Sequence, residues 1–390
     1  MTHFIDFAYD SIHKHGEELC GDNVEMVRME DGMIIVMADG LGSGVKANIL
    51  ATLTSKIAAT MLKEGSSIHE TVDTIIHTLP VCNIRKLAYS TFTIIRLYDD
   101  GRVYAVEYDN PPLIFIQDHV VSQMSKRQEE ISGRMITETH FILKPNDVLT
   151  IISDGVVHAG VGAVLNLGWK WENVANHLKQ VVSKEKCAKN ISKNLIGVCQ
   201  SLYENRPGDD STVVTVKLRQ PEIIDLFTGP PKDKDDDRWV VRKLIQGKGK
   251  KIVCGGTAAN IVSRELNAEL HVNMDFIDPE VPPTASIKGI DLVTEGVLTL
   301  NKAVEKIIDY NHSSQNMYTI HNIQGKDGAS KLAKYLIEDC THLNLWVGTA
   351  VNPAHQNPDF PMEFSIKVKV VEKLEKVMRN MGKEVSTTFI

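Results

Sequence analysis

The chain has few cysteines, no long apolar run and no dense basic cluster. Its six cysteines are scattered over 390 residues without a Cys-x-x-Cys pair. This spacing argues against a cysteine zinc site and against a secreted disulfide framework, so a reducing cytoplasm is the expected setting. The longest apolar runs, such as Met33–Ala38 and Val148–Ile152, fall far short of the roughly 20 residues of a membrane span. No basic region followed by an apolar core stands at the N-terminus, so no signal peptide is expected.

The overall composition is that of a soluble globular protein. Hydrophobic residues make up 43% of the chain, charged residues 24%, and the formal net charge is −7. Without a basic patch, nucleic acid is not expected as a partner. The length favours two domains.

Acidic motifs are the most informative feature that is present. Each places an aspartate at the end of an apolar run or in a tight turn, where strands would carry it to one edge of a sheet. Several carboxylates that converge on one point repel each other or share cations, and hard oxygen ligands favour Mg(II) or Mn(II). In chain order the motifs are Gly21-Asp22-Asn23, Ala38-Asp39-Gly40-Leu41-Gly42-Ser43-Gly44, Ser153-Asp154-Gly155 and Asp209-Asp210-Ser211-Thr212.

Around these motifs the first half of the chain predicts strands and helices in an α+β order. A helix is expected over residues 45–63, where Ile49, Leu53, Ile57 and Met61 recur at every fourth position and predict one buried stripe. Two apolar strands flank Asp99-Asp100-Gly101, which is a strong hairpin signal. The expected architecture is two antiparallel sheets with helices outside. The remaining expected elements are strands 33–38, 113–116, 148–152 and 212–218 and helices 171–182 and 188–202.

A second, smaller α/β domain is expected at the C-terminus, over residues 238–390. Proline, glycine and charged residues are concentrated from Gly229 to Asp237. This composition predicts a solvated linker over residues 221–237, after a first domain of residues 1–220. The second domain should contain helix 239–244, strand 251–254, helix 258–266 and helix 300–308.

The order of the acidic motifs resembles the metal-dependent protein phosphatases of the 2C (PPM) type, in particular the branch named for stage II sporulation protein E. The resemblance covers about residues 8–218 and rests on Cys20-Gly21-Asp22, Met37–Gly44, Tyr89–Thr93, Ile152–Gly155 and Gly208–Thr212. It implies an αββα sandwich with a two-metal centre of Mn(II) or Mg(II) at one end.

The same resemblance assigns a role to each acidic position. Asp39 would bridge both metals, the Gly40 carbonyl would serve one of them, and Asp22 the second. Asp154 and Asp209 would serve the first metal. Asp210 stands where many relatives have asparagine, so the choice between Asp209 and Asp210 as direct ligand stays open.

The implied reaction is hydrolysis of phosphoserine or phosphothreonine in a phosphorylated protein, with Asp39 and Asp154 as catalytic residues. Two cations about 3.5–4 Å apart hold a bridging hydroxide that attacks phosphorus. Typical substrates in the family are anti-anti-sigma-type regulators. Two alternatives remain: a degenerate fold that binds a phosphoprotein or ligand without turnover, and a phosphatase acting on a small metabolite captured by the second domain.

One departure from the broader superfamily concerns the substrate phosphate. Many relatives carry an arginine shortly before the first acidic motif, whereas here no arginine precedes Asp22, and the basic residues nearby are His13, Lys14 and His15. The sporulation branch commonly lacks that arginine too. His158 is expected at the surface, and Cys20 as a small buried residue.

The second domain contains a glycine-rich turn, Gly255-Gly256-Thr257, between a strand and a helix. Such turns present N–H groups to phosphate or carboxylate, although this one matches neither the Walker A pattern nor the dinucleotide fingerprint. Asp291, Thr294 and Glu295 are candidates to complete a pocket for a small-molecule effector. The alternative is a tight strand–helix connection without a ligand.

Overall fold

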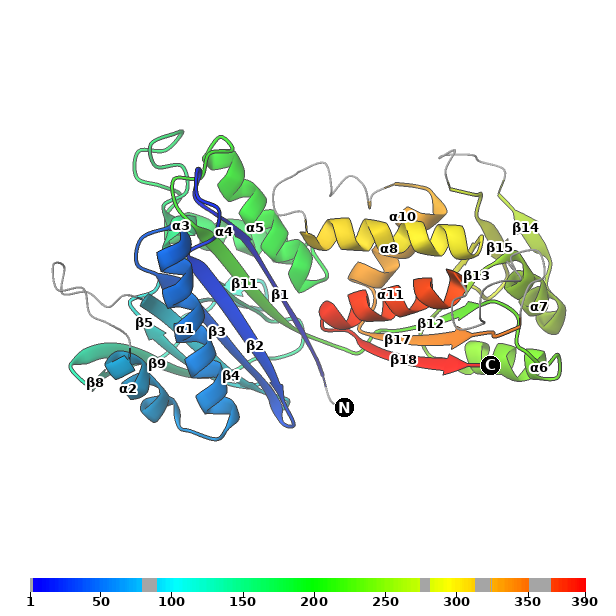
Figure 1. Cartoon of the computed structure of the whole chain (residues 1–390), viewed down its shortest axis with the longest axis horizontal. Helices are drawn as coiled ribbons and strands as arrows, with labels where there is room; N and C mark the ends of the chain where they lie inside the picture. Colours follow the sequence, from blue (N-terminus) through cyan, green and yellow to red (C-terminus); the bar gives the residue numbers. More distant parts are fainter. Residues whose placement is uncertain (1–2, 79–89, 274–280, 313–322, 324, 351–365) are drawn as a thin grey trace. The chain divides into compact units, whose positions relative to one another are not determined.

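The computed structural model describes residues 3–78, 90–273, 281–312, 323, 325–350 and 366–390. The chain divides into two compact units, Met1–Gln220 and Pro221–Ile390 (Figure 1). Each unit is described separately below. Tyr89, from the motif Tyr89–Thr93, and Cys82, one of the six cysteines, lie outside the described residues.

The first unit contains two antiparallel sheets. The six-stranded sheet has the order β2-β3-β4-β5-β9-β8, and the five-stranded sheet has the order β1-β11-β10-β6-β7. The strands of the first sheet are Asp22–Met29 (β2), Gly32–Gly40 (β3), Ser90–Tyr98 (β4), Arg102–Tyr108 (β5), Lys126–Ile131 (β8) and Arg134–Ile142 (β9). Those of the second are Phe4–Ile12 (β1), Ile114–Gln117 (β6), Val120–Val121 (β7), Val148–Ile152 (β10) and Ser211–Arg219 (β11).

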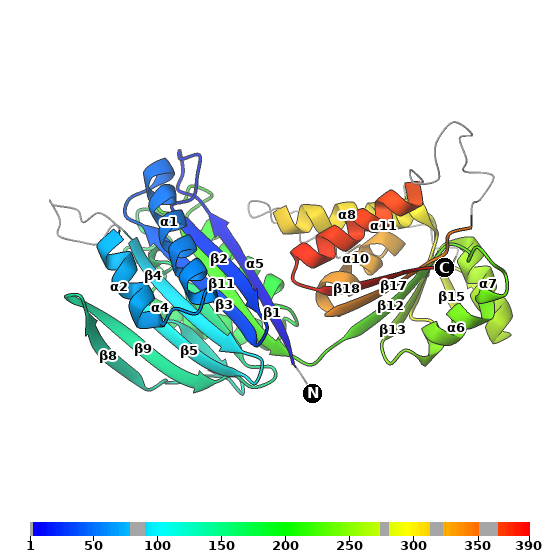
Figure 2. The ribbon, with the colours of Figure 1, turned by 60° about the horizontal axis from the view of Figure 1, so that its bottom comes forward.

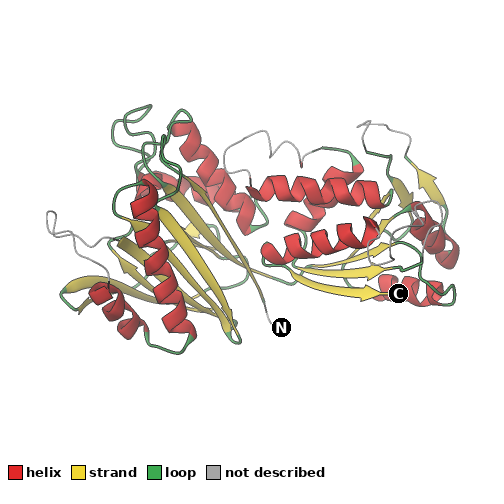
Figure 3. Ribbon diagram, in the orientation of Figure 1, coloured by secondary structure: helices red, strands yellow, loops and turns green. Residues whose placement is uncertain are grey.

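Helices cover the outer faces of both sheets, so the unit has four layers in the order αββα (Figures 2 and 3). One apolar cluster fills the space between the sheets, and two others lie between each sheet and its helices. The continuous apolar run of β3 follows from this arrangement, because Met33, Ile35 and Met37 face the opposite sheet while Ile34 and Val36 face the helices. The helices on the six-stranded sheet are Gly44–Lys63 (α1) and Ile68–Thr78 (α2). Those on the five-stranded sheet are Asp154–Val157 (α3), Trp171–Val182 (α4) and Ala188–Leu202 (α5).

These elements confirm the expected α+β class, the helix after Gly44 and the hairpin around Asp99-Asp100-Gly101. The predicted buried stripe of α1 is wrong in its first half, however. Ile49 is 52% exposed and Leu53 is 48% exposed, whereas Ile57 is partly buried against the core. The face that packs on the sheet carries mainly small residues, including Ala47, Ala51 and Ala58. Small side chains let the helix lie close to the sheet, and Ile49 and Leu53 are left on the outer face.

The second unit is a doubly wound α/β domain. Its five parallel strands have the spatial order β16-β13-β12-β17-β18, which is 3-2-1-4-5 in chain order, and β14 and β15 extend one edge in antiparallel pairing. The strands are Ile223–Thr228 (β12), Lys250–Cys254 (β13), Leu270–Val272 (β14), Ala285–Ile287 (β15), Leu292–Thr294 (β16), His342–Val347 (β17) and Glu384–Phe389 (β18). The helices are Asp236–Gln246 (α6), Gly256–Leu266 (α7), Val297–His312 (α8), Gly328–Glu338 (α10) and Ile366–Asn380 (α11).

The expectation that residues 221–237 form a linker is therefore corrected. β12 pairs with β13 on one side and with β17 on the other, so it is the central strand of the second sheet. Asp236 already belongs to α6. The breaker-rich residues from Gly229 onward form the turn between β12 and α6 rather than a connection between domains.

Candidate metal centre

The acidic motifs of the first unit lie at ends of strands from both sheets. Asp22 begins β2, and Asp39 lies near the end of β3. Asp154 follows β10, and Asp209 and Asp210 precede β11. Ser153 donates its N–H to the Thr212 carbonyl at 3.0 Å, and its hydroxyl accepts from the Thr212 N–H at 2.8 Å, so these two strand ends are fixed side by side.

Asp22 and Asp39 are held together by strand register. They are directly opposite each other in the antiparallel pair of β2 and β3. Residues in such positions have Cβ atoms about 4.5–5.5 Å apart, and like charges there are destabilising. The pair therefore needs protons or cations between or beside its carboxylates.

Burial makes this need stronger. Asp22 is 6% exposed, and neither of its carboxylate oxygens has a hydrogen-bond partner of normal geometry among the described residues. The hydroxyl groups of Thr212 and Ser153 lie near enough to lower its pKa, but desolvation outweighs them and raises that pKa to about 7. A buried carboxylate without partners is a costly arrangement unless a ligand completes it.

Asp39 links Asp22 to the aspartates of the other sheet. Desolvation, followed by repulsion from Asp22, Asp154 and Asp209, raises its pKa to about 10. Its side chain also lies within hydrogen-bonding reach of Asp154, which raises the pKa further. Asp154 itself is exposed and gives this group of carboxylates an open side.

Asp209 and Asp210 differ in their surroundings. Desolvation and then the charge of Asp154 raise the pKa of Asp209, and the cationic Lys14 opposes that shift. Asp210 is 4% exposed, and its Oδ1 accepts the N–H of Lys14 at 3.0 Å. Desolvation raises the pKa of Asp210 as well. The contacts thus associate Asp209 with Asp154 and Asp39, and Asp210 with the segment before β2.

Glycines allow the backbone to approach this group of carboxylates. A Cβ on Gly40 would lie 2.1 Å from the Ala47 carbonyl oxygen, and one on Gly155 would lie 1.9 Å from the Asp210 carbonyl oxygen. Gly42 and Gly44 have φ values of +104° and +71°, which favour glycine. Glycines at these positions thus serve two purposes, close backbone approach at Gly40 and Gly155 and positive φ at Gly42 and Gly44.

The N-terminus of α1 lies beside a carboxylate of the same chain. The Ser43 hydroxyl donates to Oε1 of Glu17 at 3.2 Å, and Gly44 leaves room for Oε2. Glu17 therefore has the favourable position that a helix N-terminus offers to negative charge. Among the other expected residues, His13 is half-buried beside Asp210, His15 and His158 are exposed, and burial raises the pKa of the Cys20 thiol.

The donor set fits divalent cations. Asp22, Asp39, Asp154 and Asp209 supply only oxygen atoms, the preferred ligands of Mg(II) and Mn(II). Their raised pKa values, where they are shifted, arise from desolvation and mutual repulsion, which cations would relieve.

In the second unit, the structure brings some predicted residues together and separates others. Gly255 donates its N–H to the Thr294 carbonyl at 2.9 Å, and Gly296 packs against it, so Glu295 lies beside the turn. Asp291 is at the opposite end of β16, where its Oδ2 accepts the Lys251 N–H at 2.8 Å. Because β13 and β16 are parallel, Asp291 cannot complete a pocket at the Gly255 turn, and that expectation is corrected.

Comparison with known proteins identifies the first unit. The stage II sporulation protein E (SpoIIE) family matches residues 29–219. This segment belongs to the SpoIIE family of PPM-type phosphatases. No curated protein sequence matches the chain.

Several solved structures align with part of the chain at low sequence identity. The RsbU and RsbW domains of a Mycobacterium tuberculosis protein align at 15% identity and a TM-score of 0.49, over 62% of this chain and 69% of that one. The SpoIIE phosphatase domain of Bacillus subtilis with a fragment of its regulatory domain aligns at 21% identity and a TM-score of 0.45, over 55% and 63%. RsbX in complex with magnesium aligns at 18% identity and a TM-score of 0.42, over 55% and 96%. Within the part of the chain that is described, no helix has both the length and the hydropathy to cross a membrane.

Proposed function

We propose that the SpoIIE-family unit is a Mn(II)- or Mg(II)-dependent phosphatase that removes phosphate from serine or threonine residues of a protein. The observation that carries the proposal is the cross-strand pair of buried Asp22 and half-buried Asp39, which lies near Asp154 and Asp209 from the other sheet. Desolvation and mutual repulsion raise the pKa values of Asp22, Asp39 and Asp209, so bound cations would stabilise the group. Membership of the SpoIIE family supports the same reaction class.

The residues have distinct parts in this proposal. Asp39 would contact both cations, Asp22 one of them, and Asp154 with Asp209 the other, while the Gly40 carbonyl adds a neutral oxygen. When bound, two divalent cations supply a water of lowered pKa and neutralise phosphoryl oxygens. The strand register holds Asp22 and Asp39 in place before any substrate arrives. Asp210 positions the segment before β2 by binding the Lys14 backbone.

The expected substrate is a phosphorylated protein, and an anti-anti-sigma-type regulator is the specific candidate. The exposed side of Asp154 leaves the carboxylate group accessible to a phosphorylated side chain presented by another protein. We further propose that the second unit binds a small-molecule effector. The Gly255-Gly256-Thr257 turn lies at the carboxyl end of β13, the end at which doubly wound sheets bind ligands.

The testing experiment is hydrolysis of p-nitrophenyl phosphate by the full chain, with and without millimolar Mn(II). The wild type is compared with Asp39→Asn, and Asp100→Asn in the β4–β5 turn is the matched control. We expect metal-dependent turnover that Asp39→Asn abolishes and Asp100→Asn retains. Metal binding without any turnover, on this compound or on a phosphorylated protein, would instead favour a non-catalytic binding fold.

A further inference from the structure

A second group of metal-ligating side chains lies on the helix-covered face of the six-stranded sheet. His69 in α2, Glu129 in β8 and Glu138 in β9 each offer a ligand atom, and these atoms all lie within 4.8 Å of one another. This group shares no residue with the aspartate centre. It is composed of one imidazole and two carboxylates from three separate elements.

Strand register fixes the two carboxylates. Arg127 of β8 is directly opposite Glu138 of β9, and Glu129 is two residues further along β8. Because side chains alternate along a strand, Glu129 and Glu138 project from the same face as diagonal neighbours. Glu138 is 5% exposed, and its Oε1 accepts a hydrogen bond from the Tyr104 hydroxyl.

The start of α2 fixes the imidazole. Ser67 and Glu70 form a reciprocal capping box, in which the Ser67 N–H donates to Glu70 Oε2 at 2.8 Å and the Glu70 N–H donates to the Ser67 hydroxyl at 3.2 Å. His69 lies in the first turn, between the two partners of that box. The Ser132 hydroxyl also donates to Asp73, which attaches α2 to the β8–β9 turn.

The imidazole faces a carboxylate on each side. Its Nε2 lies 2.9 Å from Glu138 Oε1, and its Nδ1 lies 3.6 Å from Glu129 Oε1. A neutral imidazole carries a single N–H, so it donates to one carboxylate and presents a bare nitrogen toward the other. Among the described residues, Arg127 makes its ion pair with Glu129, at 3.4 Å. A metal ion at this position would be bound by the bare nitrogen and by both carboxylates.

We propose that His69, Glu129 and Glu138 form a site for a divalent transition-metal ion, with Zn(II) as the best match. A nitrogen ligand beside two carboxylates suits Zn(II) better than Mg(II), which prefers oxygen ligands only. Three protein ligands leave one position for water on the exposed side of His69. The Tyr104 hydroxyl orients the Glu138 carboxylate in the way that outer partners orient metal ligands. Bound metal joins the N-terminus of α2 to the β8–β9 hairpin (Figure 2).

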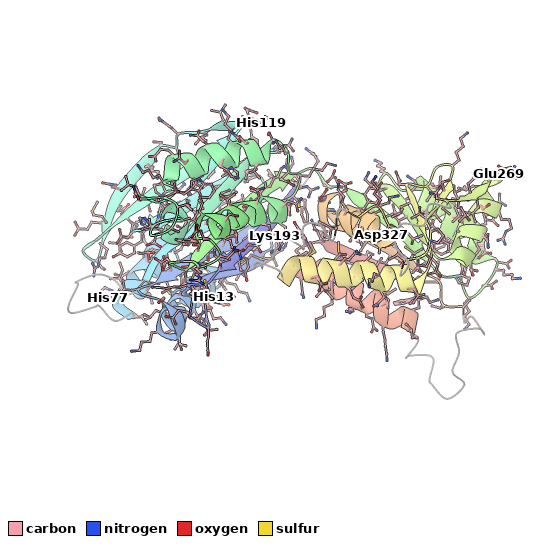
Figure 4. All side chains as sticks on the ribbon, turned by 90° about the horizontal axis from the view of Figure 1, so that it is seen from above. His13, His77, His119, Lys193, Glu269 and Asp327 are labelled. Atoms are coloured by element: carbon pink, nitrogen blue, oxygen red, sulfur yellow. The ribbon has the colours of Figure 1, made fainter. Side chains whose placement is uncertain are left out.

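The experiment uses Co(II) as a spectroscopic probe for Zn(II), added to the metal-free full chain. All proteins carry Asp39→Asn together with Asp154→Asn, so that both metal positions of the aspartate centre are disabled and the result does not depend on phosphatase activity. His69→Gln is compared with His77→Gln. His77 lies in the same helix (Figure 4). Among the described residues its ion-pair partner is Asp73, with Nδ1 3.3 Å from Oδ1.

We expect one equivalent of Co(II) to bind with visible absorption bands and to be displaced by Zn(II). His69→Gln should weaken that binding at least tenfold, whereas His77→Gln should leave it unchanged. Glu129→Gln, which leaves the Glu138–Tyr104 contact in place, should weaken it as well. Zn(II) should also slow hydrogen exchange at the first turn of α2 in the parent protein and not in His69→Gln.

Two results would overturn the site. One is equal Co(II) affinity in His69→Gln and His77→Gln. The other is no binding to a parent protein whose circular dichroism shows it to be folded, in which case the group is a set of side-chain contacts without a metal.

Discussion

Asp22 and Asp39 are cross-strand neighbours in the β2–β3 ladder, so the polypeptide backbone itself forces two carboxylates together. This placement does not depend on flexible side chains meeting by chance. It is specified by the strand pairing and supported by the apolar residues of β3, which are buried on both faces. The folded state therefore contains this repulsion between carboxylates, and a bound cation would reduce it.

The stability of the metal-free protein should fall as pH rises. The folded pKa values of Asp22 and Asp39 are raised to about 7 and about 10, above the ordinary value of 3.8. Between about pH 4 and about pH 7 the folded state therefore holds more protons than the unfolded chain, and the free energy of unfolding decreases by about 1.4 kcal/mol per pH unit for each extra proton. The measurement is the urea midpoint of the metal-free chain at several pH values.

Added Mn(II) should reverse this trend, because it displaces those protons and gains affinity as they are released. The stabilisation by Mn(II) should thus increase with pH. The matched control is Asp39→Asn, whose midpoint should vary less with pH. An equal pH dependence in the variant and the wild type would contradict the assigned cause.

Asp209 and Asp210 should respond differently to the same substitution. Asp209→Asn removes a charge coupled to Asp154 and should reduce turnover on aryl phosphate by about 100-fold, equivalent to about 2.7 kcal/mol. Asp210→Asn retains an oxygen that accepts the Lys14 N–H, so its turnover should fall much less. Parallel Mn(II) titrations of turnover test this, and the reverse order would make Asp210 the direct ligand.

Gly40→Ala should damage both stability and activity. Its Cβ would lie 2.1 Å from the Ala47 carbonyl oxygen, so the start of α1 or the end of β3 must move. We expect a loss of about 1–3 kcal/mol in unfolding free energy and at least tenfold lower turnover. Gly197→Ala in α5 is the control, since no atom lies within 4 Å of its Cβ, and it should gain about 0.5–1 kcal/mol. A Gly40→Ala protein as stable as the wild type would show that this close approach is not required.

The two faces of α1 should differ in their tolerance of substitution. Ile49→Ser on the exposed face should change the unfolding free energy by no more than about 0.5 kcal/mol. Ala51→Leu on the buried face should cost about 1–3 kcal/mol, because the sheet leaves no room for it. Chemical denaturation of both variants measures these changes in unfolding free energy. A large loss for Ile49→Ser with little loss for Ala51→Leu would show that the face predicted from the sequence is the buried one.

The sequence predicted the boundaries of α1 well and its orientation badly, for one physical reason. Hydrophobic periodicity gives weight to Ile49 and Leu53, whereas the buried side is made of alanines, whose small side chains carry little signal. In the same way the predicted linker includes Ile223–Thr228, because the breaker-rich, charged residues 229–237 follow it directly, although its apolar residues form a central strand. In a sequence-based prediction, nearby proline and glycine residues have more weight than an apolar segment of only six residues.

The candidate centre was easier to predict than the second metal-ligating group. Asp22, Asp39 and Asp154 each end or begin an apolar strand, so a local pattern marks them. His69, Glu129 and Glu138 come from three elements whose contact depends on the β8–β9 register and the docking of α2. No local sequence pattern predicts a contact between side chains from three distant segments. Asp291 shows the converse error, since closeness to Thr294 in sequence placed it at the wrong end of β16.

The junction between the units also constrains how the chain can be divided. β11 ends at Arg219 and β12 begins at Ile223, so Gln220, Pro221 and Glu222 alone separate a strand of one sheet from the central strand of the other. A cut within residues 229–237 would leave β12 attached to the first unit without its strand partners. It would also remove the central strand from the parallel sheet of the second unit. Recombination or proteolysis that preserves both halves must therefore act within those three residues.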